Sequence, residues 1–261
     1  MEIRNRVWLG LGVVVAASAA FYAGTSSQTE MSHDMAMAEE GGEGGEGASS
    51  ADAISSDAVY LAQLSFIRGH LYVGVSLYRE GDLEAAATHM KHPGDELYAA
   101  LLPAIESREG KGFGDQLEGL ADAVIERRAA ADVESAYTAL LSAIGEAEAA
   151  VRDLSARTLG EVIVDLVRTA AAEYDIAVDD KGMLVEPHEY QDSLGFVHTA
   201  REKFALLETM SDNTAALMAI ETQLEVLLPI WPSLQAPEKL STAPSVIYGA
   251  ASRIEIATTQ L

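Results

Sequence analysis

The sequence predicts an all-α protein that folds as an antiparallel helical bundle, either a single bundle or two pseudo-repeated ones. Hydrophobic residues make up 49% of the 261 residues and aromatic residues only 6%, a composition typical of packed helices. From residue 57 onward, the long apolar stretches repeat at helical spacing rather than with the alternation of strands. The connections between them are short, which favours antiparallel neighbours.

Residues 1–24 have the pattern of an export signal. Arg4 and Arg6 precede an apolar run from Val7 to Ala23, which matches a charged region followed by a hydrophobic region. The run is also at the lower limit for spanning a bilayer, so a cleaved signal peptide and an uncleaved N-terminal anchor both stay open. We therefore expect a periplasmic protein, either free or anchored to the inner membrane by this segment.

Residues 25–56 are rich in glycine, serine, alanine and acids, and we expect them to form a disordered linker. The linker opens with Met31, His33, Met35 and Met37. Thioether and imidazole groups suit Cu(I), so this run is a candidate copper collector. The alternative is a disordered segment whose methionines have no role.

Residues 57–155 read as the first half of the bundle. Apolar residues at helical spacing predict a long helix, a turn at residues 80–82 around Gly81, and a returning helix over residues 83–92. Pro93 and Gly94 end that helix. Three further helices are predicted over about 95–107, 113–128 and 133–154.

Residues 156–261 read as the second half. A helix with its apolar stripe over residues 162–174 leads to a turn at 179–182, and Pro187 begins a helix that runs to about Met210. Further helices are predicted over about 213–230 and 245–257. Each half contains Leu-Leu-Pro in its third helix, at residues 101–103 and 227–229, so internal duplication and chance similarity both stay open.

Three histidines are expected near one another in the first hairpin. His70 lies eleven residues before Gly81 and His92 eleven after it, so the two should lie side by side. His89 is one turn from His92, and Glu96 follows four residues later. Histidine with carboxylate suits iron, zinc, copper or manganese without selecting among them. The alternative is that these are ordinary core and surface histidines.

The second hairpin offers a second candidate site, formed by Glu173 and Asp192. Glu173 lies at the edge of the apolar stripe, and Asp192 lies near its level when both are counted from the turn. Carboxylates at such positions need a cation or a hydrogen-bond partner. His188 and His198 each have an acid four residues later, and for His198 we expect only a solvent-exposed pair.

The charge and the motif content of the sequence argue against several classes of function. The chain has 17 basic and 41 acidic residues, a net charge of -24, which argues against a nucleic-acid partner. The absence of cysteine excludes disulfides, thiolate metal sites and a lipidated cysteine. Because the chain has no nucleophile elbow, phosphate loop, dinucleotide fingerprint or zinc-protease motif, we do not expect an enzyme.

Residues 170–197, AAAEYDIAVDDKGMLVEPHEYQDSLGFV, resemble the helical periplasmic segment of some bacterial high-affinity iron permeases. In that family a helix with a tyrosine and an acid leads into a glycine turn and a Glu-Tyr pair, and the matching positions are Glu173, Tyr174, Asp175, Gly182, Glu189 and Tyr190. The permease's membrane helices and their Arg-Glu-Gly-Leu-Glu motif are missing. The body also resembles the iron-associated imelysins, without their Gly-x-His-x-x-Glu motif.

From the residues and the resemblance we expect an exported helical protein that binds or delivers iron or copper as an accessory to metal uptake. Its partner would be a membrane transporter or another periplasmic protein. The alternative is a non-catalytic periplasmic interaction or scaffold protein without a metal.

Overall fold

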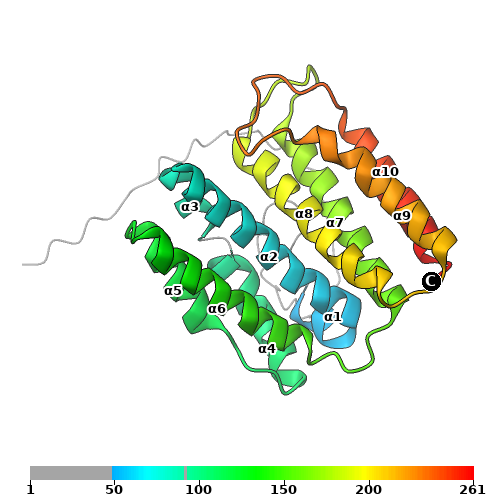
Figure 1. The fold of residues 1–261 in the computed structure, drawn as a ribbon, viewed down its shortest axis with the longest axis horizontal. Coiled ribbons are helices and arrows are strands. Elements are labelled where there is room, and N and C mark those ends of the chain that lie inside the picture. The colour runs from blue at the N-terminus through cyan, green and yellow to red at the C-terminus, as the bar shows by residue number, and fades with distance from the viewer. Residues whose placement is uncertain (1–48, 91–92) are drawn as a thin grey trace, which may run out of the picture. The chain divides into compact units, whose positions relative to one another are not determined.

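Helix α2 (Asp57–Glu80) packs against helices of both halves of the chain. The structure is a computed structural model that describes residues 49–90 and 93–261. Figure 1 shows α2 between α6 and α8, with α7, α9 and α10 beyond α8. The prediction of an all-α antiparallel bundle is confirmed. The other helices are α1 (Ser50–Ser55), α3 (Leu83–His89), α4 (Ala99–Ser107), α5 (Gly114–Ile125), α6 (Ala130–Glu148), α7 (Ala156–Ala177), α8 (Pro187–Glu208), α9 (Thr214–Leu227) and α10 (Pro244–Thr258), with a π-helix at Pro93–Tyr98 and a 3-10 turn at Leu228–Ile230.

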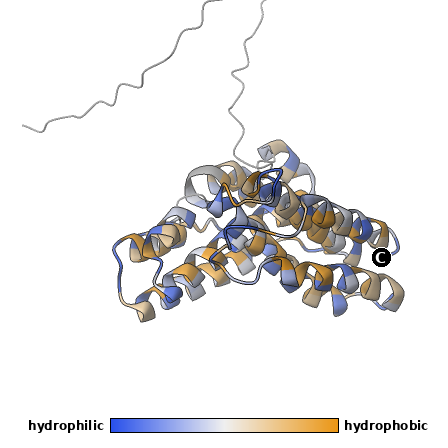
Figure 2. Ribbon diagram, turned by 90° about the horizontal axis from the view of Figure 1, so that it is seen from above, coloured by the Kyte–Doolittle hydropathy of each residue, from blue (hydrophilic) through white to orange (hydrophobic). Residues whose placement is uncertain are grey.

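Helices α7 to α10 close into a four-helix bundle. α7 packs against α8 and α10, and α9 also packs against α8 and α10. Figure 2 shows that the helices of the protein carry both hydrophobic and hydrophilic residues, as expected when one face of each helix is buried. Among the helices described, none is both long and apolar enough to cross a membrane.

The backbones of α2 and α8 approach closely at two glycines. A Cβ added to Gly195 would lie 2.6 Å from the carbonyl oxygen of Gly69, and one added to Gly69 would lie 2.6 Å from the Phe196 ring. The absence of side chains here lets the two helices touch. His70 directly follows Gly69, and Asp192 lies one turn before Gly195, so this crossing sets the distance between them.

A third glycine brings α3 against α2. A Cβ on Gly74 would lie 3.2 Å from the Cβ of His89 and closer still to the Met90 side chain. Gly81 then allows the turn between the two helices, because its φ of 88° is unfavourable for other residues. These two positions hold His89 of α3 over the same stretch of α2 that carries His70.

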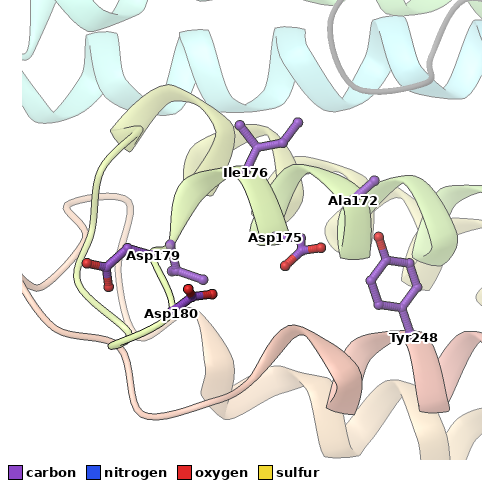
Figure 3. A pocket seen from close by; sticks show the side chains of 7 residues that line it. Ala172, Asp175, Ile176, Asp179, Asp180 and Tyr248 are labelled. Carbon is purple, nitrogen blue, oxygen red and sulfur yellow. The ribbon is translucent and has the colours of Figure 1, made fainter.

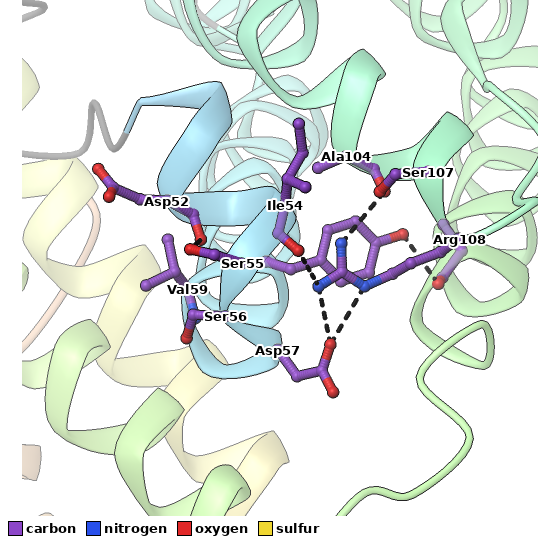
Figure 4. A network of polar contacts seen from close by, with 11 residues as sticks. Asp52, Ile54, Ser55, Ser56, Asp57, Val59, Ala104, Ser107 and Arg108 are labelled. Carbon is purple, nitrogen blue, oxygen red and sulfur yellow. Dashed lines mark hydrogen bonds and ion pairs between the residues drawn. The ribbon is translucent and has the colours of Figure 1, made fainter.

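Residues 50–55 fall inside the predicted linker, but they form helix α1. Ala53 is buried, and the Ser50 hydroxyl donates to the carbonyl of Ala100 at 2.6 Å. Arg108 ties the α1–α2 junction to the end of α4, donating to the Asp57 carboxylate at 2.7 Å and the Ala104 carbonyl at 3.2 Å (Figure 4). The packed body therefore includes α1, and a linker boundary at residue 56 is too late.

Two helix ends also differ from the prediction. α3 ends at His89 rather than at residue 92, and the next helical turns begin at Pro93 as a π-helix before α4. Proline has no amide N–H and its ring clashes with the preceding turn, so residue 93 favours the start of a new helical segment over the continuation of α3. α6 ends at Glu148 rather than near residue 154.

Candidate metal centre

A buried carboxylate, Asp192, lies at the meeting point of three helices. Its Oδ1 lies 2.6 Å from Nδ1 of His70 on α2 and 3.0 Å from Nδ1 of His89 on α3. The exposed fractions of these three side chains are 2% or less. We call His70, His89 and Asp192 the inner cluster; its three ligand atoms lie within 4.8 Å of one another.

The other oxygen of Asp192 faces a third imidazole. Oδ2 lies 3.0 Å from Nδ1 of His188, one turn earlier on α8. The His188 ring stacks on that of His89 with centroids 4.0 Å apart and an interplanar angle of 9°. The His188 side chain is 21% exposed, so it lies between the inner cluster and solvent. Together with Glu189 and Asp192 it forms a second group whose ligand atoms lie within 4.8 Å, here called the outer cluster.

The imidazoles determine the charge state of Asp192. Burial alone would raise the pKa of this carboxyl, but the charge of His70 and hydrogen bonds with His188 and His70 hold the pKa well below its usual value. For His188, burial lowers the pKa, while the hydrogen bond and the charge of Asp192 outweigh it and leave the pKa raised. Asp192 is therefore ionised in the folded protein.

A chain of hydrogen bonds fixes the orientation of His89. Nε2 of Gln191 donates to the Leu234 carbonyl at 3.2 Å, which leaves Oε1 of Gln191 as the acceptor for Nε2 of His89 at 2.8 Å. Nε2 of His89 must then carry a hydrogen. In neutral His89, Nδ1 consequently carries a lone pair and no hydrogen, and it lies 3.0 Å from Oδ1 of Asp192 without a hydrogen-bond partner.

The segment after α9 is bound along α8 beside the cluster. The Trp231 indole donates to the Ser193 hydroxyl at 2.7 Å, and the Tyr190 hydroxyl donates to the Ser233 carbonyl at 3.0 Å. Tyr174 of α7 similarly donates to the Thr242 carbonyl at 3.1 Å. The two tyrosines of the string that resembles iron permeases thus hold this segment in place.

The candidate residues from the sequence fall into three groups. His70, His89 and Asp192 come together, although they were predicted in two separate sites. Glu173 is fully buried on α7, and neither ligand group found among the described residues includes it. The remaining candidates lie outside what the structure describes: Met31, His33, Met35, Met37, His92 and the side chain of Glu96.

His198 provides a contrast on the same helix. Its ring stacks on Tyr72 with centroids 3.6 Å apart, and its Nε2 lies 3.5 Å from Glu202. Both partners of this ion pair are at least one-third exposed. This matches the solvent-exposed pair expected for His198.

Sequence reasoning missed Gln191 and noted His188 only as an i, i+4 partner of Asp192. A glutamine directly before a candidate ligand carries no signal by itself. The glycines at 69, 74 and 195 inside helices were the available clue, because glycine in a helix interior costs stability and indicates close backbone approach.

An acidic pocket of about 590 Å³ opens on the surface beside α7 and α10. Figure 3 shows Asp175, Asp179 and Asp180 around it, with Tyr248 on the far wall. Oδ1 of Asp179 already accepts the backbone N–H groups of Lys181 and Met183, each at 2.8 Å. That carboxylate organises the turn after α7, as short acidic side chains commonly do.

Residues 148–261 match the family model of the iron permease-associated 4-helix bundle domain. The matched segment begins at the last residue of α6 and contains α7 to α10, the helices that close into a bundle. The resemblance predicted from residues 170–197 is therefore confirmed for this segment. The chain has no match among the curated proteins or the solved structures.

Proposed function

We propose that this protein binds a transition-metal ion, in the first place iron, at the inner cluster and serves iron uptake as a non-enzymatic accessory of a membrane permease. Asp192 and its neighbours come from the segment that matches the permease-associated domain, whereas His70 and His89 come from the preceding helices. The site is thus completed by the part of the chain that the family match does not cover.

The observation that carries this proposal is the pairing of His89 with Asp192. Nδ1 of neutral His89 and Oδ1 of Asp192 are both acceptors and lie 3.0 Å apart, and no hydrogen bond satisfies the buried Nδ1. Two lone pairs at this distance repel unless a proton or a metal ion lies between them. A metal ion would convert this repulsion into ligation.

The donor set suits the proposed cargo. Two imidazole nitrogens and one carboxylate oxygen form a donor set typical of non-haem Fe(II) sites. With metal–ligand bonds of about 2.0–2.2 Å, ligand atoms at right angles lie about 2.8 Å or more apart. The 3.0 Å pair fits this spacing, and the 2.6 Å pair of His70 and Asp192 needs to open by about 0.2 Å.

The same distances favour a second account, in which protons rather than a metal bridge the cluster. Separations of 2.6 Å and 3.0 Å are also close to the range of about 2.7–2.9 Å for charge-assisted hydrogen bonds between nitrogen and oxygen. The chain would then be a non-catalytic interaction or scaffold protein with a polar core. Measuring whether the protein binds a metal ion distinguishes the metal-bridged from the proton-bridged cluster.

Anaerobic titration of the metal-free protein with Fe(II), followed by calorimetry and thermal unfolding, tests the proposal. A ligand that binds only the folded state raises the melting temperature with its concentration. We expect one tight ion per chain, lost in His89→Ala and retained in His198→Ala. Absence of binding to the wild-type protein would favour the proton-bridged account.

The proposal also includes a location, the periplasm, and a partner, a membrane permease. The charged and apolar leader supports export to the periplasm, and the family match supports a permease as partner. The match to an iron-related family favours iron over copper, whose sulfur donors would come from Met31, Met35 and Met37, outside the described residues.

Gln191→Leu should weaken metal binding without removing a ligand. The substitution removes the acceptor that holds Nε2–H of His89 and so leaves the imidazole free to change tautomer. Losing such a supporting partner typically costs about 10–100-fold in affinity. Calorimetric titration checks this, and an affinity within about twofold of wild type would show that Gln191 does not orient His89.

The stability of the metal-free protein should fall as pH rises through the folded pKa of His188, whereas the extra stability given by bound metal should grow with pH. The pKa of His188 is raised by Asp192, so its contribution to stability is complete below about pH 6.5 and is lost as pH rises through the higher folded pKa. The pKa of Asp192 is lowered, so its contribution is present above about pH 3.9 and is lost as pH falls through the lower folded pKa.

Metal ligation requires deprotonated imidazole, so the gain in melting temperature on adding Fe(II) should grow between about pH 5.5 and 8. Melting curves with and without metal across this range measure it. A gain that does not change with pH would argue against histidine ligation.

A further inference from the structure

We propose that the outer cluster of His188, Glu189 and Asp192 is a second metal position, through which an ion is loaded into and released from the inner cluster. The inference rests on the proposed function, because it assigns a route to the same site. It is carried by the two oxygens of Asp192, by the gradient of exposure between the clusters, and by the grouping of the outer ligand atoms.

The two oxygens of Asp192 face different ligands. Oδ1 lies 2.6 Å and 3.0 Å from the inner imidazoles, whereas Oδ2 lies 3.0 Å from Nδ1 of His188. A carboxylate in this position can bind an ion through either oxygen or bridge two ions about 3.5–4 Å apart. An ion can therefore pass from one position to the other without leaving Asp192.

Exposure increases from the inner cluster to the outer one. The inner histidines are 1% and 0% exposed, while the His188 side chain is 21% exposed and Glu189 is half-buried. The rings of His89 and His188 stack with centroids 4.0 Å apart, so an inner and an outer imidazole lie side by side. An ion arriving on this side meets His188 and Glu189 before it reaches His89.

The sequence of α8 explains why the outer ligands converge. Asp192 lies three residues after Glu189 and four after His188, and these spacings place side chains on one helix face. Pro187 begins the helix, so the outer cluster occupies its first turns. The partial positive charge of a helix N-terminus opposes a cation, which favours weak and rapidly reversible binding there.

The test uses Co²⁺ as an optical probe with full-length protein and the variant Glu189→Gln. Wild type should bind one ion tightly and a second weakly. Glu189→Gln should lose the weak ion and keep the tight one with a dissociation constant within about twofold. Because loading and release use the same route, stopped-flow absorbance and chelator competition should show both rates falling together, by about tenfold.

Glu186→Gln is the matched control, since it removes the same charge three residues earlier at an exposed position. Its rates should equal those of wild type. Equal slowing in both variants would show diffuse electrostatic attraction and overturn the inference, as would unchanged rates and two bound ions in Glu189→Gln. Wild-type protein that binds no ion would instead overturn the proposed function, and this inference with it.

Discussion

Replacing Asp192 by asparagine is expected to weaken metal binding strongly and to lower the free energy of unfolding by about 3 kcal/mol, because the buried imidazoles lose the carboxylate they share. The amide cannot provide negative charge to His70, His89 and His188 together. Metal affinity should fall by more than about 100-fold, the upper end of the loss caused by removing a supporting residue. Urea unfolding and calorimetric titration measure the two effects.

Glu202→Gln on the same helix is the control for Asp192→Asn. Glu202 is 48% exposed and lies 3.8 Å from Arg68 and 3.5 Å from His198. Exposed pairs of this kind contribute about 0–1 kcal/mol, so this variant should unfold nearly as wild type does and bind metal normally. Similar small losses of stability in both variants would show that Asp192 is not the electrostatic centre described above.

Replacing Gly195 by alanine should cost about 2 kcal/mol of unfolding free energy, although alanine is normally the better helix former. The added methyl group would lie 2.6 Å from the Gly69 carbonyl oxygen and 2.8 Å from the Val73 side chain. The backbone oxygen cannot rotate away, so α8 has to move from α2. This movement separates His70 from Asp192, and metal affinity should fall together with stability.

Gly145→Ala is the matched control for Gly195→Ala. Gly145 also lies inside a long helix, α6, but a Cβ there would have no neighbour within 4 Å. This variant should gain up to about 1 kcal/mol from helix propensity. Opposite signs for the two variants would demonstrate the close approach of α2 and α8. A stabilising effect at both positions would contradict it.

The fold was largely predictable because its helices are encoded locally. The helix predicted from Pro187 to about Met210 is observed at Pro187–Glu208, since a proline at the first turn and an apolar stripe are both local signals. α1 was missed because its six residues bury chiefly Ala53, and so small an apolar contribution does not stand out in a polar segment.

The site was predictable only in part. Counting from a turn aligns residues within one hairpin, and it found His70, His89 and Asp192 as candidates in separate hairpins. Their meeting depends on the crossing of α2 and α8 at Gly69 and Gly195, a contact between residues more than a hundred positions apart. Gln191 was missed because its role depends on the backbone of Leu234, which no helix periodicity reveals.

The most direct test of the central claim is the position of a bound ion. Crystals of the protein grown anaerobically with Fe(II) should show an anomalous scattering peak at the iron edge about 2.0–2.3 Å from Nδ1 of His89 and Oδ1 of Asp192. The peak should disappear in His89→Ala. No peak within the inner cluster, or a peak confined to the acidic pocket beside Asp175 and Asp180, would contradict the assignment.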